Sequence, residues 1–187
     1  MLSQAALAWL VLCGAHPRVA FVPAAPNLAE ATGDYRRIWE MEGERIVASF
    51  EAIVGVEYPG SAIEAIVTEG RPMAAFDGRT IRLRAGYRPT YMKATLVHEL
   101  GHRLAFTLRP PAGLDDHELL YLFLYDVWTD LYGQPFADRM AAIERRIGPR
   151  YAAAWDFALG LTRDERQALL RRLRAPEPGE PAALDPS

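Results

Sequence analysis

The chain has little cysteine, little net charge and no long hydrophobic run. Its single cysteine, Cys13, excludes an intrachain disulfide and a cysteine-based zinc site. The formal net charge is −3, and no basic block is interleaved with aromatic residues, which argues against a nucleic-acid partner. No apolar segment reaches the roughly 20 residues that a membrane-spanning helix needs, so no stable membrane span is expected.

The length and the composition are those of one globular domain. The chain has 187 residues, 50% of them hydrophobic, which is enough for one sizeable core and too little for two. We expect this domain to cover residues 28–174. Residues 175–187 are rich in proline, glutamate and alanine, and we expect them to be disordered.

Residues 1–27 differ in character from the rest of the chain. Residues 5–13 form an apolar run of the length found in signal peptides, and small residues follow at the place of cleavage. The first four residues carry no positive charge, which a signal peptide normally has. We expect an export signal followed by a linker, hence a secreted or periplasmic protein. The alternative is a cytoplasmic protein with an N-terminal helix.

Hydrophobic spacing predicts an α+β fold. Apolar residues recur at helical spacing over residues 34–55, which indicates a scaffold helix that ends at Gly55. A strand rich in isoleucine and valine follows at residues 62–68, and residues 73–84 predict a tight hairpin that turns at Asp77 and Gly78. Together these segments predict a small twisted sheet.

The sequence HELGH at residues 98–102 carries the clearest chemical signal. Residues four apart share one face of a helix, so His98 and His102 can direct imidazole nitrogens at one metal ion, with Glu99 beside it. Two histidines supply half of a tetrahedral zinc shell; a third protein ligand must come from elsewhere, and water takes the open position. The helix that carries the motif is expected to span residues 89–108.

On this motif the chain resembles the zincin metallopeptidases. The resemblance implies that His98 and His102 bind Zn²⁺, and that Glu99 is the general base for the attack of water on a carbonyl of a peptide or protein substrate. Arg103 departs from the family, which usually has an uncharged residue there. Alternatives are a chance match on a buried helix, a non-catalytic zinc-binding or interaction module, and a zinc amidase acting on a cell-wall amide.

The resemblance also gives the hairpin a role. In zincins a sheet edge beside the metal cleft can bind an extended peptide by strand addition, and residues 73–84 are the candidate for that edge. The alternative is a charged strand whose exposed arginines only prevent aggregation.

The motif does not fix the third zinc ligand. Ala105 and Leu108 occupy the positions of the glycine and histidine that a metzincin would have, so that subclass is excluded. In gluzincins a carboxylate on the following helix completes the site. That helix is expected to begin near Asp116, and its candidate ligands are His117, Glu118 and Asp126.

We expect Asp126 to be the third ligand. If the two helices run antiparallel, the level of the metal projects to about residue 124 on the second helix. Asp126 also lies in an apolar stretch, where an unpaired carboxylate would be costly. Asp130, one turn later, is then the carboxylate that orients a ligand histidine. Glu118 is the second choice.

Other roles are open for these residues. Asp126 could be paired with an arginine such as Arg103. His117 and Glu118 could be exposed residues at the helix start. Three tyrosines could donate to an oxyanion, but a core position is more common for each and none is assigned: Tyr121, Tyr125 and Tyr132. Beyond Gly133, we expect helices at residues 136–147 and 151–159, and a third that opens with a capping box at Thr162.

Overall fold

The computed structural model describes residues 17–174, and they begin with a strand that the sequence did not indicate. Strand β1 (Val19–Pro23) pairs in parallel with β2 (Ile63–Thr68). Its only buried residue is Phe21, so its apolar pattern is too short to be distinctive. Strand β1 thus belongs to the sheet although it precedes residue 28, where we expected the domain to begin. The expected export signal and C-terminal tail lie outside the described residues, at 1–16 and 175–187.

The predicted strand and hairpin are confirmed. The hairpin consists of β3 (Met73–Ala74) and β4 (Thr80–Arg84), which pair antiparallel, and the sheet order is β1-β2-β4-β3. β2 and β4 run parallel, so the sheet is mixed. The turn is held by the Asp77 carboxylate, which accepts hydrogen bonds from the backbone amides of Arg79 and Thr80.

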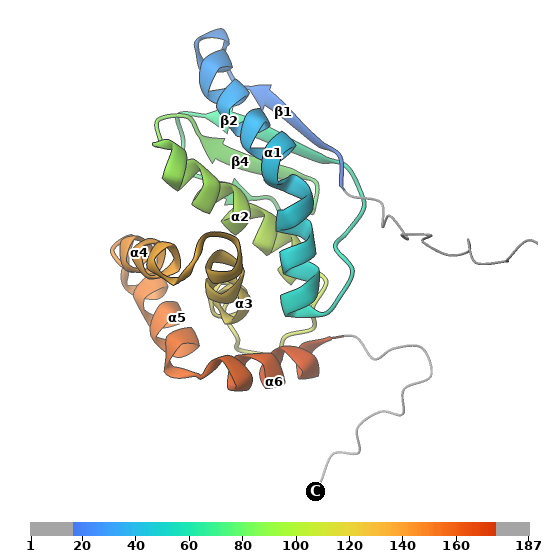
Figure 1. Ribbon diagram of the computed structural model, residues 1–187, viewed down its shortest axis with the longest axis vertical. Helices are drawn as coiled ribbons and strands as arrows, with labels where there is room; N and C mark the ends of the chain where they lie inside the picture. Colours follow the sequence, from blue (N-terminus) through green and yellow to red (C-terminus); the bar gives the residue numbers. More distant parts are fainter. Residues whose placement is uncertain (1–16, 175–187) are drawn as a thin grey trace, which may run out of the picture.

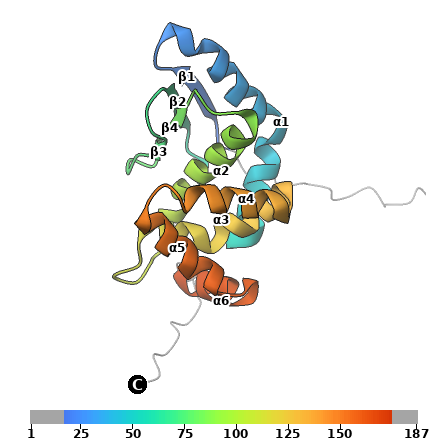
Figure 2. The same cartoon turned by 90° about the vertical axis from the view of Figure 1, so that its left-hand side faces the viewer.

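One face of the sheet is covered by two helices. In β4, Ile81 and Leu83 are buried whereas Arg82 and Arg84 are exposed, as the alternating sequence predicts. Helices α1 (Ala29–Val54) and α2 (Pro89–Ala105) pack on the apolar face, as Figure 2 shows from the side. The predicted scaffold helix is thus confirmed, and it ends at Gly55, whose φ of 71° lies in the left-handed region.

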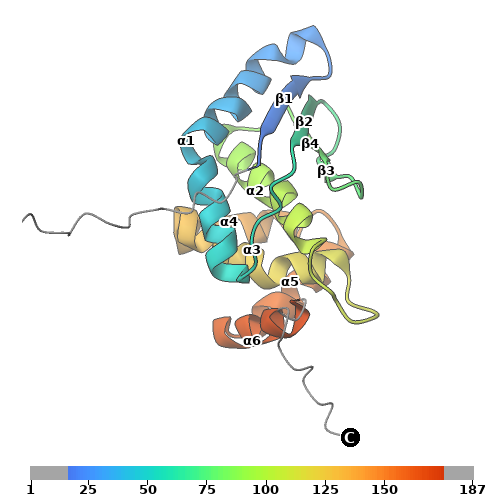
Figure 3. The ribbon, with the colours of Figure 1, turned by 90° about the vertical axis from the view of Figure 1, so that its right-hand side faces the viewer.

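The rest of the described chain is helical. In all three ribbon views these helices lie at the end of the molecule away from the strands (Figures 1, 2 and 3). The capping box predicted at Thr162 opens one of them, and a second capping box, which was not predicted, opens another at Asp115. No helix within residues 17–174 has the length and apolarity needed to cross a membrane. The four helices are α3 (Asp116–Tyr132), α4 (Gln134–Glu144), α5 (Pro149–Gly160) and α6 (Arg163–Leu173).

Candidate metal centre

Helix α2 places the two motif histidines on one face. Its opposite face consists of leucines with no exposed surface, among them Leu96 and Leu100, which fix the helix against the core. His98 and His102 lie one turn apart, and their Nε2 atoms are 3.2 Å from each other. The motif therefore forms the paired imidazoles that its spacing predicts.

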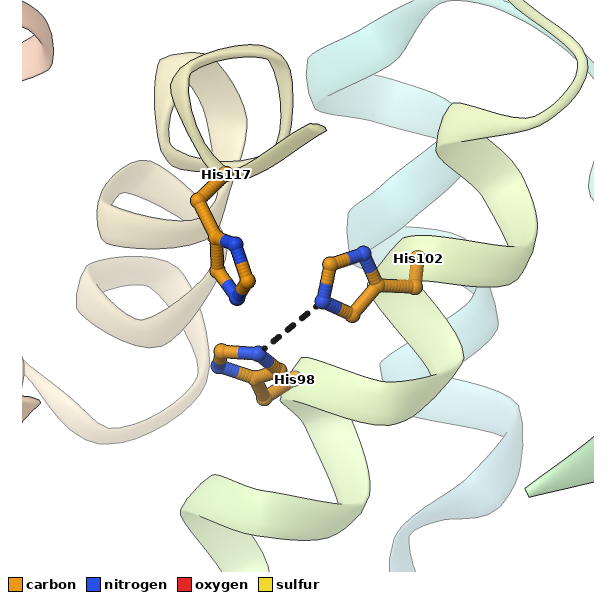
Figure 4. A group of neighbouring side chains, drawn as sticks. All are labelled: His98, His102 and His117. Carbon is orange, nitrogen blue, oxygen red and sulfur yellow. Dashed lines mark hydrogen bonds between the residues drawn. The ribbon is translucent and has the colours of Figure 1, made fainter. Parts of the chain in front are cut away.

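A third imidazole comes from the first turn of α3. One ring nitrogen each of His98, His102 and His117 can be chosen so that all lie within 4.8 Å of one another. Figure 4 shows the three rings turned toward a common point, His117 from one helix and the motif pair from another. The position of His117 is fixed by the start of α3, because its backbone amide donates a 2.9 Å hydrogen bond to the capping carboxylate of Asp115.

The separation of the two motif nitrogens agrees with that of two ligands on one zinc ion. Zinc lies about 2.0–2.1 Å from imidazole nitrogens, so two such nitrogens in a tetrahedral shell are about 3.3–3.4 Å apart. The observed 3.2 Å between the Nε2 atoms of His98 and His102 is close to that separation. Three histidines with a fourth position open to water are also one of the donor sets found in catalytic zinc sites.

A buried carboxylate orients the first of these histidines. Glu144 Oε1 lies 2.8 Å from His98 Nδ1, and the indole Nε1 of Trp155 donates to Glu144 Oε2 over 3.2 Å. With Nδ1 donating to the carboxylate, Nε2 of His98 keeps its lone pair for a metal. Tyr121 then stacks on Trp155 at a centroid distance of 3.9 Å, which packs the back of this network.

Glu99 is buried beside the histidines, with 4% of its surface exposed. Its Oε2 atom has no hydrogen-bond partner among residues 17–174, which is unusual for a buried carboxylate. Burial raises the pKa of Glu99 to about 7, although the neighbouring His98 counteracts part of the effect. A carboxylate with that pKa can both accept and release a proton near neutral pH.

The pKa values of the histidines differ according to their neighbours. Burial favours neutral His98, but the Glu144 carboxylate outweighs burial and raises the pKa of His98 to about 9. Burial and repulsion from His98 and His117 lower the pKa of His102 to about 2. Burial also lowers the pKa of His117, and His98 adds to that effect. These shifts favour the neutral forms of His102 and His117, while the Glu144 carboxylate favours the charged form of His98.

The structure does not bring Asp126 to the histidines. Its carboxylate is buried in an ion pair with Arg166, in which Nη2 donates to Oδ1 at 2.7 Å and Nε to Oδ2 at 3.1 Å. The expectation that a buried carboxylate here needs a partner holds, but the partner is a guanidinium. It is not Arg103, whose Nη2 donates over 2.8 Å to the carbonyl of Ser61.

The other two carboxylates predicted for the site are also not grouped with the histidines within the described residues. Asp130 is exposed on α3, and Glu118 closes the capping box by accepting from the Asp115 amide. Two of the three tyrosines are engaged away from the histidines, Tyr125 with Asp138 and Tyr132 with Glu42. The third, Tyr121, has its ring centroid 5.5 Å from that of His117.

His117 lies nearer the start of α3 than the projected residue 124, and the earlier end of α2 accounts for part of the difference. α2 ends at Ala105 and not at residue 108, which moves the projected level to about residue 121, one turn beyond His117. The helices touch there: a Cβ atom on Gly101 would lie 2.6 Å from Cδ1 of Leu120. His117 lies one turn before Tyr121, and its ring meets the rings of His98 and His102 (Figure 4). Glu144 gave no signal in the sequence, since it sits among charged residues at the end of a helix.

Comparison of the chain with known proteins identifies no homologue. No protein-family model matches the chain, and neither a curated protein nor a solved structure matches it. The resemblance to zincins therefore rests on the HELGH motif alone.

Proposed function

We propose that the protein is a zinc-dependent metallopeptidase. The observation that carries this proposal is the grouping of His98, His102 and His117 around one point, with the buried carboxylate of Glu99 beside them. In this proposal His117 replaces Asp126 as the third zinc ligand. A purely structural zinc site is usually closed by four protein ligands and needs no base, whereas three histidines leave a position for water.

The residues around the site have distinct tasks. Bound zinc lowers the pKa of a coordinated water to about 7 and polarises a carbonyl oxygen. Glu99 accepts the proton that water loses as it attacks the amide carbon, and then delivers that proton to the leaving amine nitrogen. Glu144 keeps the imidazole of His98 in the tautomer that offers Nε2 to the metal.

A peptide is the substrate class that the surroundings favour. β3 lies at one edge of the sheet, and Phe76, just after it, borders the same cavity as His102. An extended chain could pair with that edge and pass the metal centre. Because β3 has only two residues, the edge supplies few backbone hydrogen bonds, and further binding energy must come from side-chain contacts.

Substitution of Glu99 tests the proposed function. Glu99→Gln keeps the size of the side chain but removes the base, so zinc content should stay unchanged while peptide cleavage falls about 100-fold to 10,000-fold. The assay is cleavage of a mixed peptide library by zinc-loaded protein, followed by mass spectrometry. The matched control is Glu64→Gln on the exposed side of β2, which should cleave like wild type.

Two results would contradict this assignment. One is cleavage by Glu99→Gln at the wild-type rate. The other is zinc-loaded wild type that cleaves no peptide in the library, which would favour a non-catalytic zinc module on the same scaffold.

A further inference from the structure

A cavity of about 310 Å³ opens next to His102. It lies where the hairpin, the end of α2 and the start of α3 meet. Small-molecule sites have volumes of about 300–1,000 Å³, so this cavity is at the lower end of that range. It far exceeds the roughly 30 Å³ that a single water molecule occupies. Since His102 belongs both to this cavity and to the candidate metal centre, a molecule held at the metal has direct access to the cavity.

The walls of the cavity are mainly apolar. Ala105 and Leu108 line it from the end of α2 and the residues after it, and Leu119 lines it from α3. Only His102 and Asp116 contribute polar side chains, and Asp116 is exposed at the start of α3. The interior therefore offers contact surface to an apolar group and few hydrogen-bond partners.

Two phenylalanines stand at the cavity with unusual exposure. Phe76 is 84% exposed and Phe106 is 40% exposed, and their ring centroids lie 5.9 Å apart. Phe76 comes from the hairpin and Phe106 from the residue that follows α2. Packing of the folded chain does not account for an aromatic ring left mostly in water, whereas an apolar ligand that covers it would.

We propose that this cavity binds an apolar side chain of the substrate, either aromatic or branched aliphatic, on the residue next to the bond that is cleaved. The proposal rests on the proposed metallopeptidase function and adds the substrate preference. Phe76 and Phe106 contact this side chain, and His102 with its metal fixes the backbone beside it. Asp116 does not select a basic side chain, because it is exposed to water and lies near the cation Arg150.

A series of amino-acid hydroxamates tests the pocket separately from the metal centre. The hydroxamate group chelates zinc in every member of the series, and only the side chain varies: glycine, leucine, phenylalanine or lysine. Affinities for the zinc-loaded protein are measured by calorimetry. We expect the leucine and phenylalanine compounds to bind at least about tenfold more tightly than the glycine compound, because their side chains bury apolar surface in the cavity.

Removal of the aromatic walls sharpens the test. Phe76→Ala and Phe106→Ala should each reduce the preference for phenylalanine over glycine, and should leave the affinity for the glycine compound unchanged. Both side chains are exposed enough for the fold to tolerate their loss. Met41→Ala, which removes an 82% exposed apolar side chain on α1, is the matched control and should change nothing.

Each other outcome contradicts a different statement. Equal affinity for all four compounds would overturn the pocket while leaving the metal centre intact. Tighter binding of the lysine compound than of the leucine compound would overturn the apolar assignment and make Asp116 the selecting group. Failure of every hydroxamate to bind would contradict the metal centre, and the pocket with it.

Discussion

Asp126 and Glu144 are both buried carboxylates in the helical half of the protein, each only 4% exposed, but they have different partners. Asp126 accepts two hydrogen bonds from the guanidinium of Arg166, and this pair joins α3 to α6. Glu144 accepts from the imidazole of His98 and the indole of Trp155, and so joins α4 and α5 to the motif helix.

The two pairs differ in whether the partner side chain keeps a nitrogen atom that can bind a further group. The guanidinium of Arg166 has no lone pair, and its remaining hydrogen-bond donors go to the carbonyls of Ala158 and Leu161, so the pair is closed and structural. The imidazole of His98 has a second nitrogen, which faces the other histidines. A buried carboxylate thus indicates that some partner exists, but only the partner decides whether the pair supports the fold or a site.

The largest effect is expected from breaking the closed pair. Asp126→Ala leaves the charge of Arg166 buried without compensation, which should lower the free energy of unfolding by about 3–5 kcal/mol. Urea denaturation followed by circular dichroism measures this loss. The double variant Asp126→Leu with Arg166→Met removes both charges and should recover most of it, although two carbonyls lose their donor. A single variant as stable as wild type would show that the pair contributes nothing.

Substitution of Glu144 is expected to have a smaller effect, which lowers the affinity for zinc and leaves the fold unchanged. In Glu144→Gln the amide oxygen can accept from His98 only if its NH₂ group faces the Trp155 N–H, so one of the two contacts is lost. Zinc affinity should fall about 10-fold to 100-fold, as is usual when a carboxylate behind a ligand histidine is removed. Competition with a chromophoric chelator measures it, with Glu64→Gln as control. Wild-type affinity would remove Glu144 from the metal centre.

The smallest effect concerns the contact that brings His117 to the motif. Gly101→Ala puts a Cβ atom 2.6 Å from Leu120, which is fully buried and must shift. Overpacking costs about 1–3 kcal/mol, and alanine regains up to about 1 kcal/mol of helix propensity. We expect a net loss of about 1 kcal/mol and weaker zinc binding, because α3 moves away with His117.

A second glycine on an open helix surface is the control for Gly101. Gly33 lies on α1 with no atom within 4 Å of its would-be Cβ, so Gly33→Ala should stabilise the fold by up to about 1 kcal/mol. Thermal unfolding of both variants tests the comparison. If both glycines respond alike, the close approach of α2 and α3 has no energetic weight.

Most of the fold could be predicted from the sequence, because its signals are local. The hairpin turn at Asp77 and Gly78, the helix start near Asp116 and the capping box at Thr162 depend on residues within a few positions of each other, and all of them formed. Strand β1 was missed because its register is set by β2, across the whole of α1. A short strand with one buried residue carries too little pattern of its own.

Only the part of the candidate site that lies on a single helix, α2, could be predicted from the sequence. His98, Glu99 and His102 are adjacent on α2, so their spacing alone places them together. His117 was among the candidates but was passed over, because the projection pointed to about residue 124; the three-residue error in the end of α2 accounts for only about one turn of that difference. Glu144 lies 46 residues from its partner His98, and nothing in its local sequence marks that pairing.

The most direct test of this account is the zinc content of purified wild type, His117→Ala and Asp126→Asn, measured by mass spectrometry after zinc loading and removal of weakly bound metal. We predict about one zinc ion per chain in wild type and in Asp126→Asn, and loss of zinc in His117→Ala. Zinc retained by His117→Ala but lost from Asp126→Asn would contradict the three-histidine centre. A wild type that holds no zinc would contradict the metal centre altogether.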